Sequence, residues 1–181
     1  MDERTIIRVS KRLSGHLRHR PGEIGLALGP GGWVPVTELL TALAGHGLPL
    51  SRAQLDEVVA GNDKRRFAFD DTGTLIRASQ GHSVDVDLGL PDADPPPTLF
   101  HGTAERFLPA ILREGLRPRS RHDVHLSRDT ETAVRVGSRH GKPVVLAVDA
   151  AAMTRDGHRF RVSANGVWLT RAVPPQYLSR H

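Results

Sequence analysis

One acidic, proline-rich stretch divides the chain: residues 79–97 have the sequence SQGHSVDVDLGLPDADPPP. The stretch holds four Asp, four Pro and no Lys or Arg, a composition typical of an exposed connection between folded parts. The net charge is +2 for residues 1–78, −4 for 79–97 and +7 for 98–181, against +5 for the whole chain. We therefore expect two lobes, residues 1–80 and 98–181, joined by a linker over 81–97.

Upstream of this stretch, the apolar pattern predicts three helices. The first spans 2–19, and Pro21 ends it because the residue before a proline is pushed out of helical geometry. The second begins at a candidate N-cap, Thr37, and the third at Ser51, which can form a capping box with Gln54. The apolar stripe of the first helix consists of Ile6, Val9, Leu13 and Leu17.

Short strands complete the N-terminal lobe. We expect strands over 26–28 and 33–36, then a hairpin whose strands, 66–69 and 74–77, flank a turn at 70–73. Three helices followed by a hairpin is the order of a winged-helix module.

Downstream of the stretch, short apolar runs alternate with helical patterns. Helices are expected over 104–113 and 130–138. Strands are expected over 98–101, 124–127, 144–149, 160–162 and 167–170. Because no regular strand–helix–strand repeat is visible, the pattern predicts an α+β fold.

Composition narrows the class of protein. A hydrophobic fraction of 38% and a charged fraction of 25% are typical of a soluble domain with a real core. The chain has no cysteine, no apolar run near the roughly 20 residues that span a bilayer, and no apolar N-terminal leader. We therefore expect a cytoplasmic protein, without disulfides or thiolate zinc sites, that does not interact with a membrane.

The basic charge favours an anionic partner. The sequence pI is about 10.6. Arg accounts for 22 of the 25 basic residues, however, and a GC-rich genome would produce that skew for no functional reason. The positions of the arginines therefore matter more than their number.

Several common site motifs are missing. The chain has no G-x-G-x-x-G after a strand, no Walker A loop, no H-E-x-x-H and no G-x-S-x-G. His16 and His19 have a spacing that could bind a metal, but no set of carboxylates or thiolates accompanies them. We expect no metal cofactor.

Three Arg- and His-rich segments stand at the ends of predicted elements. They are LSGHLRHRP (13–21), NDKRRF (62–67) and RPRSRHDVHLS (117–127). Each alone is typical of a solvated face. Together, distant cations at element ends are a common way to build an oxyanion pocket.

These segments and others, in the same order, resemble the RNA 2′-phosphotransferase family, which acts on tRNA. The resemblance covers nearly the whole chain. The further matching segments are GWVPVTELL (32–40), IRASQGHS (76–83), LFHGT (99–103), VHLS (124–127), VGSRHGKPVVLAVDA (136–150) and NGVWLT…VPPQYL (165–178).

The resemblance implies a fold and a reaction. It implies a winged-helix-like N-terminal lobe that binds RNA, and a C-terminal lobe with the ADP-ribosyltransferase fold that binds NAD⁺ as a co-substrate. An internal RNA 2′-phosphate would attack NAD⁺, releasing nicotinamide and forming a 2′-phospho-ADP-ribosylated RNA. The final products would be 2′-hydroxyl RNA and ADP-ribose 1″,2″-cyclic phosphate, a reaction of tRNA splicing and RNA repair.

The family's site residues carry over to named positions. The implied catalytic residues are Arg18, His19, Arg66 and Arg121. The implied NAD⁺-binding residues are His101, Gly102, Thr103, Ser127, Gly137, Arg139 and His140. Arg65 leaves the choice of Arg66 open on the residues alone, although the family spacing selects Arg66. Where the family usually has a second histidine before VHLS, this chain has Asp123, whose carboxylate we expect to point away from a bound phosphate.

These residue types suit that reaction. A phosphate monoester is largely dianionic at neutral pH, so it needs no general base to attack. Accordingly no Glu follows Glu131, whereas protein-modifying ADP-ribosyltransferases generally have a late catalytic Glu. Guanidinium groups stabilise the charge of a transferring phosphoryl group. With an aromatic fraction of only 4%, RNA contact should be mainly to the backbone, with Arg4, Arg8, Lys11 and Arg12 as candidates.

Two other functions remain open. One is a different ADP-ribosyltransferase, acting on nucleic-acid phosphate ends, a protein or a small molecule. The other is a non-catalytic winged-helix nucleic-acid binder, which would give no reason for LFHGT or VGSRHG. Nothing in the sequence demands more than a monomer.

Overall fold

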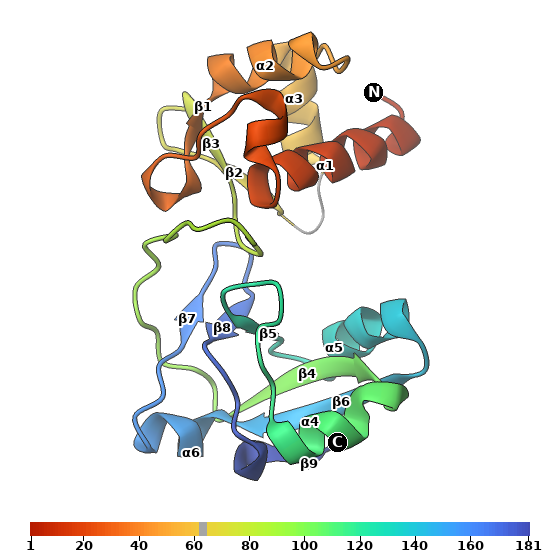
Figure 1. Ribbon diagram of the computed structural model, residues 1–181, viewed down its shortest axis with the longest axis vertical. Coiled ribbons are helices and arrows are strands. Elements are labelled where there is room, and N and C mark those ends of the chain that lie inside the picture. The colour runs from red at the N-terminus through yellow and green to blue at the C-terminus, as the bar shows by residue number, and fades with distance from the viewer. Residues whose placement is uncertain (62–64) are drawn as a thin grey trace. The chain divides into compact units, whose positions relative to one another are not determined.

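The computed structural model describes residues 1–61 and 65–181, which form two compact units, Met1–Gly89 and Leu90–His181 (Figure 1). Each unit has its own hydrophobic core. The described residues form helices and three small antiparallel sheets, so the predicted α+β class is confirmed. The division between the units falls inside the acidic stretch 79–97.

The first helix of unit 1, α1 (Glu3–Arg18), is close to its predicted bounds. Asp2 caps it, and its carboxylate accepts the backbone N–H of Thr5 at 2.7 Å. Pro21 opens a 3₁₀ turn, η1 (Pro21–Ile24), beyond the helix end. The predicted stripe is confirmed for its fully buried members, Val9, Leu13 and Leu17.

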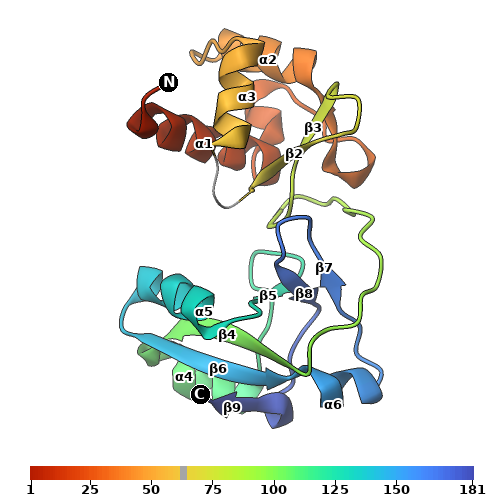
Figure 2. The ribbon, with the colours of Figure 1, turned by 180° about the vertical axis from the view of Figure 1, so that it is seen from behind.

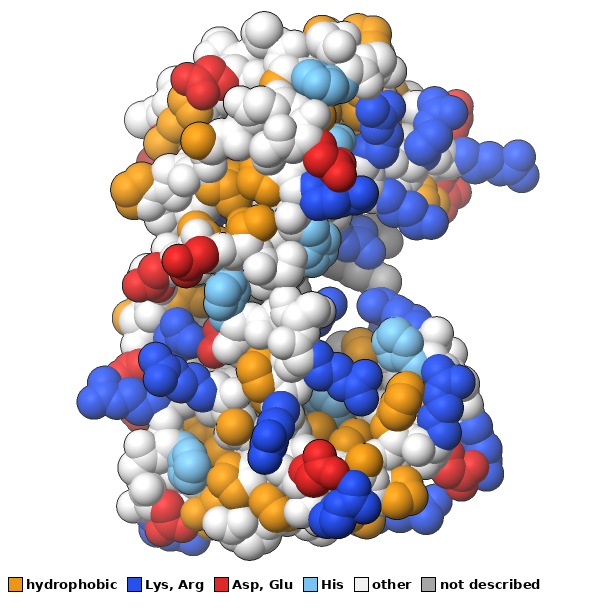
Figure 3. Space-filling model, viewed as in Figure 1, with side chains coloured by type: hydrophobic (Ala, Val, Ile, Leu, Met, Phe, Trp, Pro, Cys, Tyr) orange, Lys and Arg blue, Asp and Glu red, His pale blue; other side chains and the backbone are white. Residues whose placement is uncertain are grey.

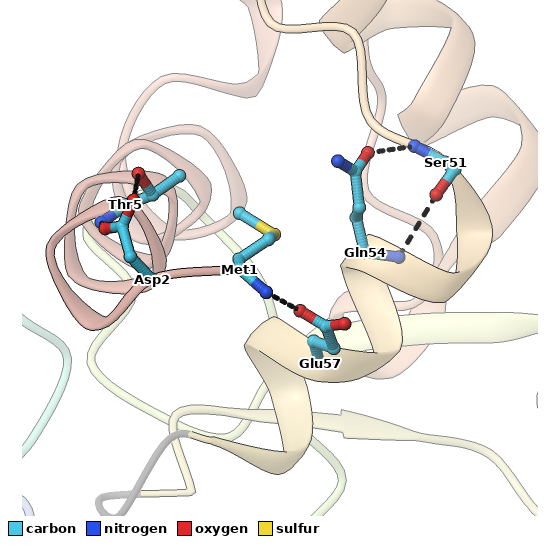
Figure 4. Close-up of polar contacts among 6 residues, drawn as sticks. All are labelled: Met1, Asp2, Thr5, Ser51, Gln54 and Glu57. Carbon is cyan, nitrogen blue, oxygen red and sulfur yellow. Dashed lines mark hydrogen bonds and ion pairs between the residues drawn. The ribbon is translucent and has the colours of Figure 1, made fainter.

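The other two helices are α2 (Val36–Gly45) and α3 (Arg52–Ala60). Figure 4 shows the predicted capping box of α3, in which Ser51 and Gln54 each bond the other's backbone N–H. Figure 4 also shows Glu57 of α3 paired with the N-terminal amino group beside α1.

The predicted N-cap Thr37 is wrong. The N-cap is Pro35, whose backbone is extended, and the helix starts one residue later at Val36. The N–H of Val36 donates to the carbonyl of Thr74 at 2.9 Å, so a bond to the hairpin takes the place of a side-chain cap.

One sheet completes unit 1, with antiparallel strands β1 (Val34–Pro35), β3 (Leu75–Ala78) and β2 (Phe67–Phe69) in that order. The predicted hairpin is therefore confirmed, and so is a shortened first strand. The predicted strand 26–28 is wrong, because the N–H of Leu26 closes the preceding turn on the carbonyl of Pro21 at 3.0 Å. A second 3₁₀ turn, η2 (Pro30–Gly32), precedes β1.

Unit 2 has two three-stranded antiparallel sheets. The first has the order β4 (Thr98–Ala104), β6 (Pro143–Asp149) and β9 (Leu178–Arg180), and the second β5 (Val124–Leu126), β8 (Trp168–Thr170) and β7 (Arg161–Val162). They meet where Phe100 of β4 exchanges backbone hydrogen bonds of 2.9 and 2.8 Å with Ser127, just after β5.

Short helices connect these strands. They are η3 (Glu105–Phe107), α4 (Leu108–Glu114), α5 (Thr130–Gly137), η4 (Ser138–His140), α6 (Ala150–Arg155) and η5 (Pro175–Tyr177). Helix α5 lies against β4 (Figures 1 and 2). The predicted helix 104–113 begins too early, since Ala104 still belongs to β4. Pro109, which favours the first turn, places the α-helix start at Leu108. Helix α6 and strand β9 were not predicted.

Hydrogen bonds anchor both halves of the acidic stretch. Arg77 of β3 donates to the carbonyl of Leu88 at 3.2 Å in unit 1. In unit 2, the N–H of Ala93 donates to the carbonyl of Phe160 at 2.8 Å, and Asp92 pairs with Arg159 at 2.8 Å. Over residues 1–61 and 65–181, no helix is long and apolar enough to cross a membrane.

Candidate active site

In unit 1, three of the four predicted catalytic residues lie close together. Arg18 is the last residue of α1 and His19 its C-cap, where the helix dipole favours cations. Arg18 Nη2 donates to the carbonyl of Arg66, just before β2, at 3.4 Å. His19 Nδ1 is hydrogen-bonded to Ser83 Oγ at 2.8 Å, and the N–H of Ser83 donates to the carbonyl of Arg18 at 2.9 Å. Residues 48 and 64 positions apart therefore meet at the end of one helix.

The geometry before β2 distinguishes Arg66 from Arg65. Arg65 is exposed and has φ +40°, a left-handed conformation that non-glycine residues seldom adopt. Arg66 is half-buried, and its carbonyl accepts both Arg18 Nη2 and the backbone N–H of Ser79. The Arg18 side chain thus contacts the backbone of Arg66, and the choice of Arg66 over Arg65 as the catalytic residue stays a prediction. The segment NDK (62–64) of the predicted cluster lies outside the described residues.

In unit 2, one strand residue links two predicted site residues. Arg121, in the loop before β5, has Nη1 2.7 Å from Nδ1 of His125. Because a guanidinium only donates, His125 must be neutral there, with its proton on Nε2. The carbonyl of His125 accepts Nδ1–H of His101, on β4, at 3.1 Å. His125 therefore positions Arg121 with its ring and His101 with its backbone.

Burial lowers the pKa values of two residues in this cluster, His101 and Arg121. Burial lowers the pKa of His101, against the smaller opposing effect of its bond to the His125 carbonyl. A neutral ring with Nδ1–H has Nε2 available as an acceptor. Burial also lowers the pKa of Arg121, and the charge of Arg139 lowers it further.

Two glycines allow α5 to pack directly on β4. A Cβ on Gly102 would lie 1.7 Å from the carbonyl oxygen of Ala133, and one on Gly137 would lie 2.6 Å from that of Thr103. Gly102, Thr103 and Gly137 are all buried. Their immediate role in the structure is this close junction.

The remaining predicted NAD⁺-binding residues lie just after α5, in the case of Arg139 and His140, and just after β5, in the case of Ser127. Gly137 ends α5, and the 3₁₀ turn η4 that follows exposes Arg139 and His140. Ser127 is fixed beside β4 by its two backbone bonds to Phe100. The guanidinium groups of Arg121 and Arg139 can donate hydrogen bonds to several oxygens at once, which suits a ligand with several phosphate oxygens.

Asp123 is engaged in an ion pair with Arg161 of β7 at 2.7 Å, and its side chain is only 12% exposed. This partner agrees with the expectation that its carboxylate does not face a phosphate. Among the described parts of the chain, no group of three or more His, Cys, Asp or Glu residues is placed to hold a metal ion.

Sequence reasoning did not select three residues that position the predicted ones: Ser79, Ser83 and His125. Each lies within a matching segment, IRASQGHS or VHLS. For His125 a local signal exists. Val124 and Leu126 are buried, so strand alternation turns the histidine to the other face.

Comparison with known proteins agrees with the resemblance to the RNA 2′-phosphotransferase family. A family model described as "RNA 2'-phosphotransferase, Tpt1 / KptA family" matches residues 4–172. The chain is 63% identical over 178 residues to a "Probable RNA 2'-phosphotransferase" of Streptomyces coelicolor, covering 98% of this chain and 97% of that protein. A protein of Trichormus variabilis with the same description is 57% identical, with 98% of each chain covered. One of Agrobacterium fabrum is 59% identical, covering 94% of this chain and 91% of its own.

Proposed function

The chain belongs to the RNA 2′-phosphotransferase family, and from that premise we propose that it removes an internal 2′-phosphate from RNA in an NAD⁺-dependent reaction. NAD⁺ is a second substrate in this proposal and not a resident cofactor. The observation that supports it best is the hydrogen-bonded series in unit 2 in which His125 bonds the guanidinium of Arg121 with its ring and the half-buried His101 with its carbonyl. This is a site chemistry that favours phosphate oxygens.

The proposed reaction has two steps. In the first, an oxygen of the RNA 2′-phosphate forms a bond to the ribose carbon that bears nicotinamide, and nicotinamide leaves with the electrons of the broken C–N bond. In the second, the neighbouring ribose 2″-hydroxyl attacks phosphorus, and the RNA 2′-oxygen leaves and takes up a proton. The products are 2′-hydroxyl RNA and ADP-ribose 1″,2″-cyclic phosphate.

We assign the second step to the four catalytic residues that the family resemblance implies, Arg18, His19, Arg66 and Arg121. Charge on the phosphoryl oxygens in the transition state is stabilised by guanidinium groups, which stay protonated and bind two oxygens at once. His19 is the one member that can also move a proton near neutral pH. In support, the guanidinium of Arg18 donates to the backbone carbonyl of Arg66, and Nη1 of Arg121 bonds Nδ1 of His125.

The NAD⁺ substrate is assigned to unit 2. Its binding residues in this proposal are His101, Gly102, Thr103, Ser127, Gly137, Arg139 and His140. The unit is then an ADP-ribosyltransferase-like lobe and unit 1 a winged-helix-like lobe. The order of three helices and a hairpin in unit 1 supports the latter assignment. We also place the reaction in the cytoplasm, with tRNA-like RNA as the substrate.

One product analysis tests the proposal. The protein is incubated with an oligoribonucleotide that has one internal 2′-phosphate, with and without NAD⁺, and the products are separated by chromatography. We expect 2′-hydroxyl RNA, nicotinamide and cyclic phosphate in equal amounts, only with NAD⁺. RNA lacking the 2′-phosphate is the control and should yield no nicotinamide.

A second function, transfer of ADP-ribose to another acceptor, predicts different products. It would release nicotinamide, leave ADP-ribose attached to the acceptor and form no cyclic phosphate. That outcome, or dephosphorylation without NAD⁺, would contradict the proposed reaction.

A further inference from the structure

The segment Ser79–Ser83 connects the two parts of unit 1 that hold proposed catalytic residues. At one end, Ser79 donates its hydroxyl to the carbonyl of Arg65 and its N–H to that of Arg66, both at 2.8 Å. At the other end, the N–H of Ser83 donates to the carbonyl of Arg18 and its Oγ bonds His19 Nδ1. Each serine thus uses both its backbone and its side chain to hold one pair of neighbouring residues.

We propose that Ser83 is a positioning residue that fixes the imidazole of His19, and that the Ser79–Ser83 segment aligns Arg18, His19 and Arg66 for one phosphate. The proposal rests on the proposed function. It assigns a role to two serines that lie outside the four catalytic residues.

The chemistry of a hydroxyl fits this role. A serine hydroxyl both donates and accepts, so it can bond Nδ1 of His19 whether or not that nitrogen bears a proton. The ring therefore keeps its orientation while Nε2 gains or loses a proton. A carboxylate at the same place would hold the ring too, but its charge would repel a phosphate dianion.

Ser79 has a matching role at the other end. The left-handed φ of Arg65 is an unfavourable conformation that its surroundings must maintain. The hydroxyl of Ser79 bonds the carbonyl of that residue, and its N–H bonds the next carbonyl. The turn that directs Arg66 is therefore held from the same segment that holds His19.

Steady-state kinetics of Ser83 variants test the proposal. We expect Ser83→Ala to lower kcat about tenfold, the size of one orienting hydrogen bond, with little change in the KM for NAD⁺. Ser83→Thr, which keeps the hydroxyl, should recover most of the loss. The control is Thr41→Ala, which removes an exposed hydroxyl of the same unit that bonds the carbonyl of Thr37 at 2.9 Å, and should have wild-type kinetics.

A measurement on the ring itself does not depend on activity. Nitrogen NMR of the histidines should show an Nδ1 chemical shift of His19 that changes in Ser83→Ala and returns toward the wild-type value in Ser83→Thr, because the hydroxyl bonds that nitrogen in the wild-type protein. An Nδ1 shift that Ser83→Ala leaves unchanged, or a kcat of Ser83→Ala equal to that of Thr41→Ala, would overturn the proposal. If instead the Nδ1 shift responds to Ser83→Ala but the wild type has no activity with NAD⁺ and 2′-phosphorylated RNA, the proposed function fails and the positioning of His19 stands.

Discussion

Replacing Gly102 by alanine should destabilise unit 2 by separating α5 from β4. The added Cβ would lie 1.7 Å from the carbonyl oxygen and 2.5 Å from the carbonyl carbon of Ala133. Ordinary contacts begin at 3.4 Å, so the helix backbone would have to retreat by about 1.7 Å. Overpacking costs about 1–3 kcal/mol, and the obstructing atoms here are backbone, which cannot rotate away. We therefore expect a loss of about 3 kcal/mol.

Thermal unfolding followed by circular dichroism measures this loss. For a chain of this size, about 3 kcal/mol corresponds to a fall in Tm of about 6–12 °C. Gly45→Ala is the matched control, because Gly45 ends α2 and nothing lies within 4 Å of its added Cβ. It should leave Tm unchanged or raise it slightly, since Ala favours helix over Gly. A Gly102→Ala protein that melts with the wild type would refute the account of the β4–α5 junction.

Three further predictions concern the helix cap, the pH dependence and the RNA. Ser51→Ala breaks the capping box of α3 and should lower the free energy of unfolding by about 1 kcal/mol in urea titrations, whereas Ser51→Gly should cost only a few tenths. Burial lowers the pKa of His101 below its ordinary 6.5, so the unfolded chain binds more protons in that range and stability should fall as pH drops from about 7 to about 5. His101→Gln should lose part of that dependence in urea titrations at both pH values. Lys and Arg side chains gather over α1 (Figure 3). Replacing Arg4, Arg8 and Lys11 by Ala should therefore weaken RNA binding. The slope of log affinity against log salt concentration should fall by about 0.7 for each phosphate contact that is lost. An unchanged slope would exclude this face as an RNA contact.

The parts of the fold that the sequence predicted correctly depend on local interactions. The buried stripe of α1 follows from helical periodicity, and the capping box at Ser51 needs only residues three apart. The turn at 70–73 is similarly local, since Gly73 takes φ +70° and its N–H bonds the carbonyl of Asp70. Signals of this kind do not require knowledge of the rest of the chain.

The elements that were missed depend on distant partners or lack a pattern. Strand β9 has three residues and exists because it pairs with β6, whose paired residues lie 30 to 34 positions earlier. Helix α6 has six residues of sequence AAAMTR, too short to show an apolar stripe, and its cap by Asp149 lies at the end of a strand. The start of α2 was misplaced because a bond to Thr74 replaces the expected cap.

The candidate site was likewise predicted in part from local patterns, and the rest depends on residues that are distant in the sequence. Periodicity and spacing placed Arg18 and His19 at a helix end but could not bring them to Arg66 or Ser83, which are 48 and 64 positions away. The choice of these residues came from the family resemblance, which relies on matching segments and not on contacts. For that reason Ser79, Ser83 and His125, which act through other residues, became visible only in the structure.

The most direct test of the central claim is a single-turnover experiment with Arg18→Ala and Arg121→Ala. The claim is that arginine side chains stabilise the phosphoryl group while it is transferred. With labelled 2′-phosphorylated RNA and NAD⁺, both variants should still release nicotinamide but accumulate 2′-phospho-ADP-ribosylated RNA, with the second step slowed about 10³-fold. Wild-type rates of 2′-hydroxyl RNA formation in either variant would contradict the claim.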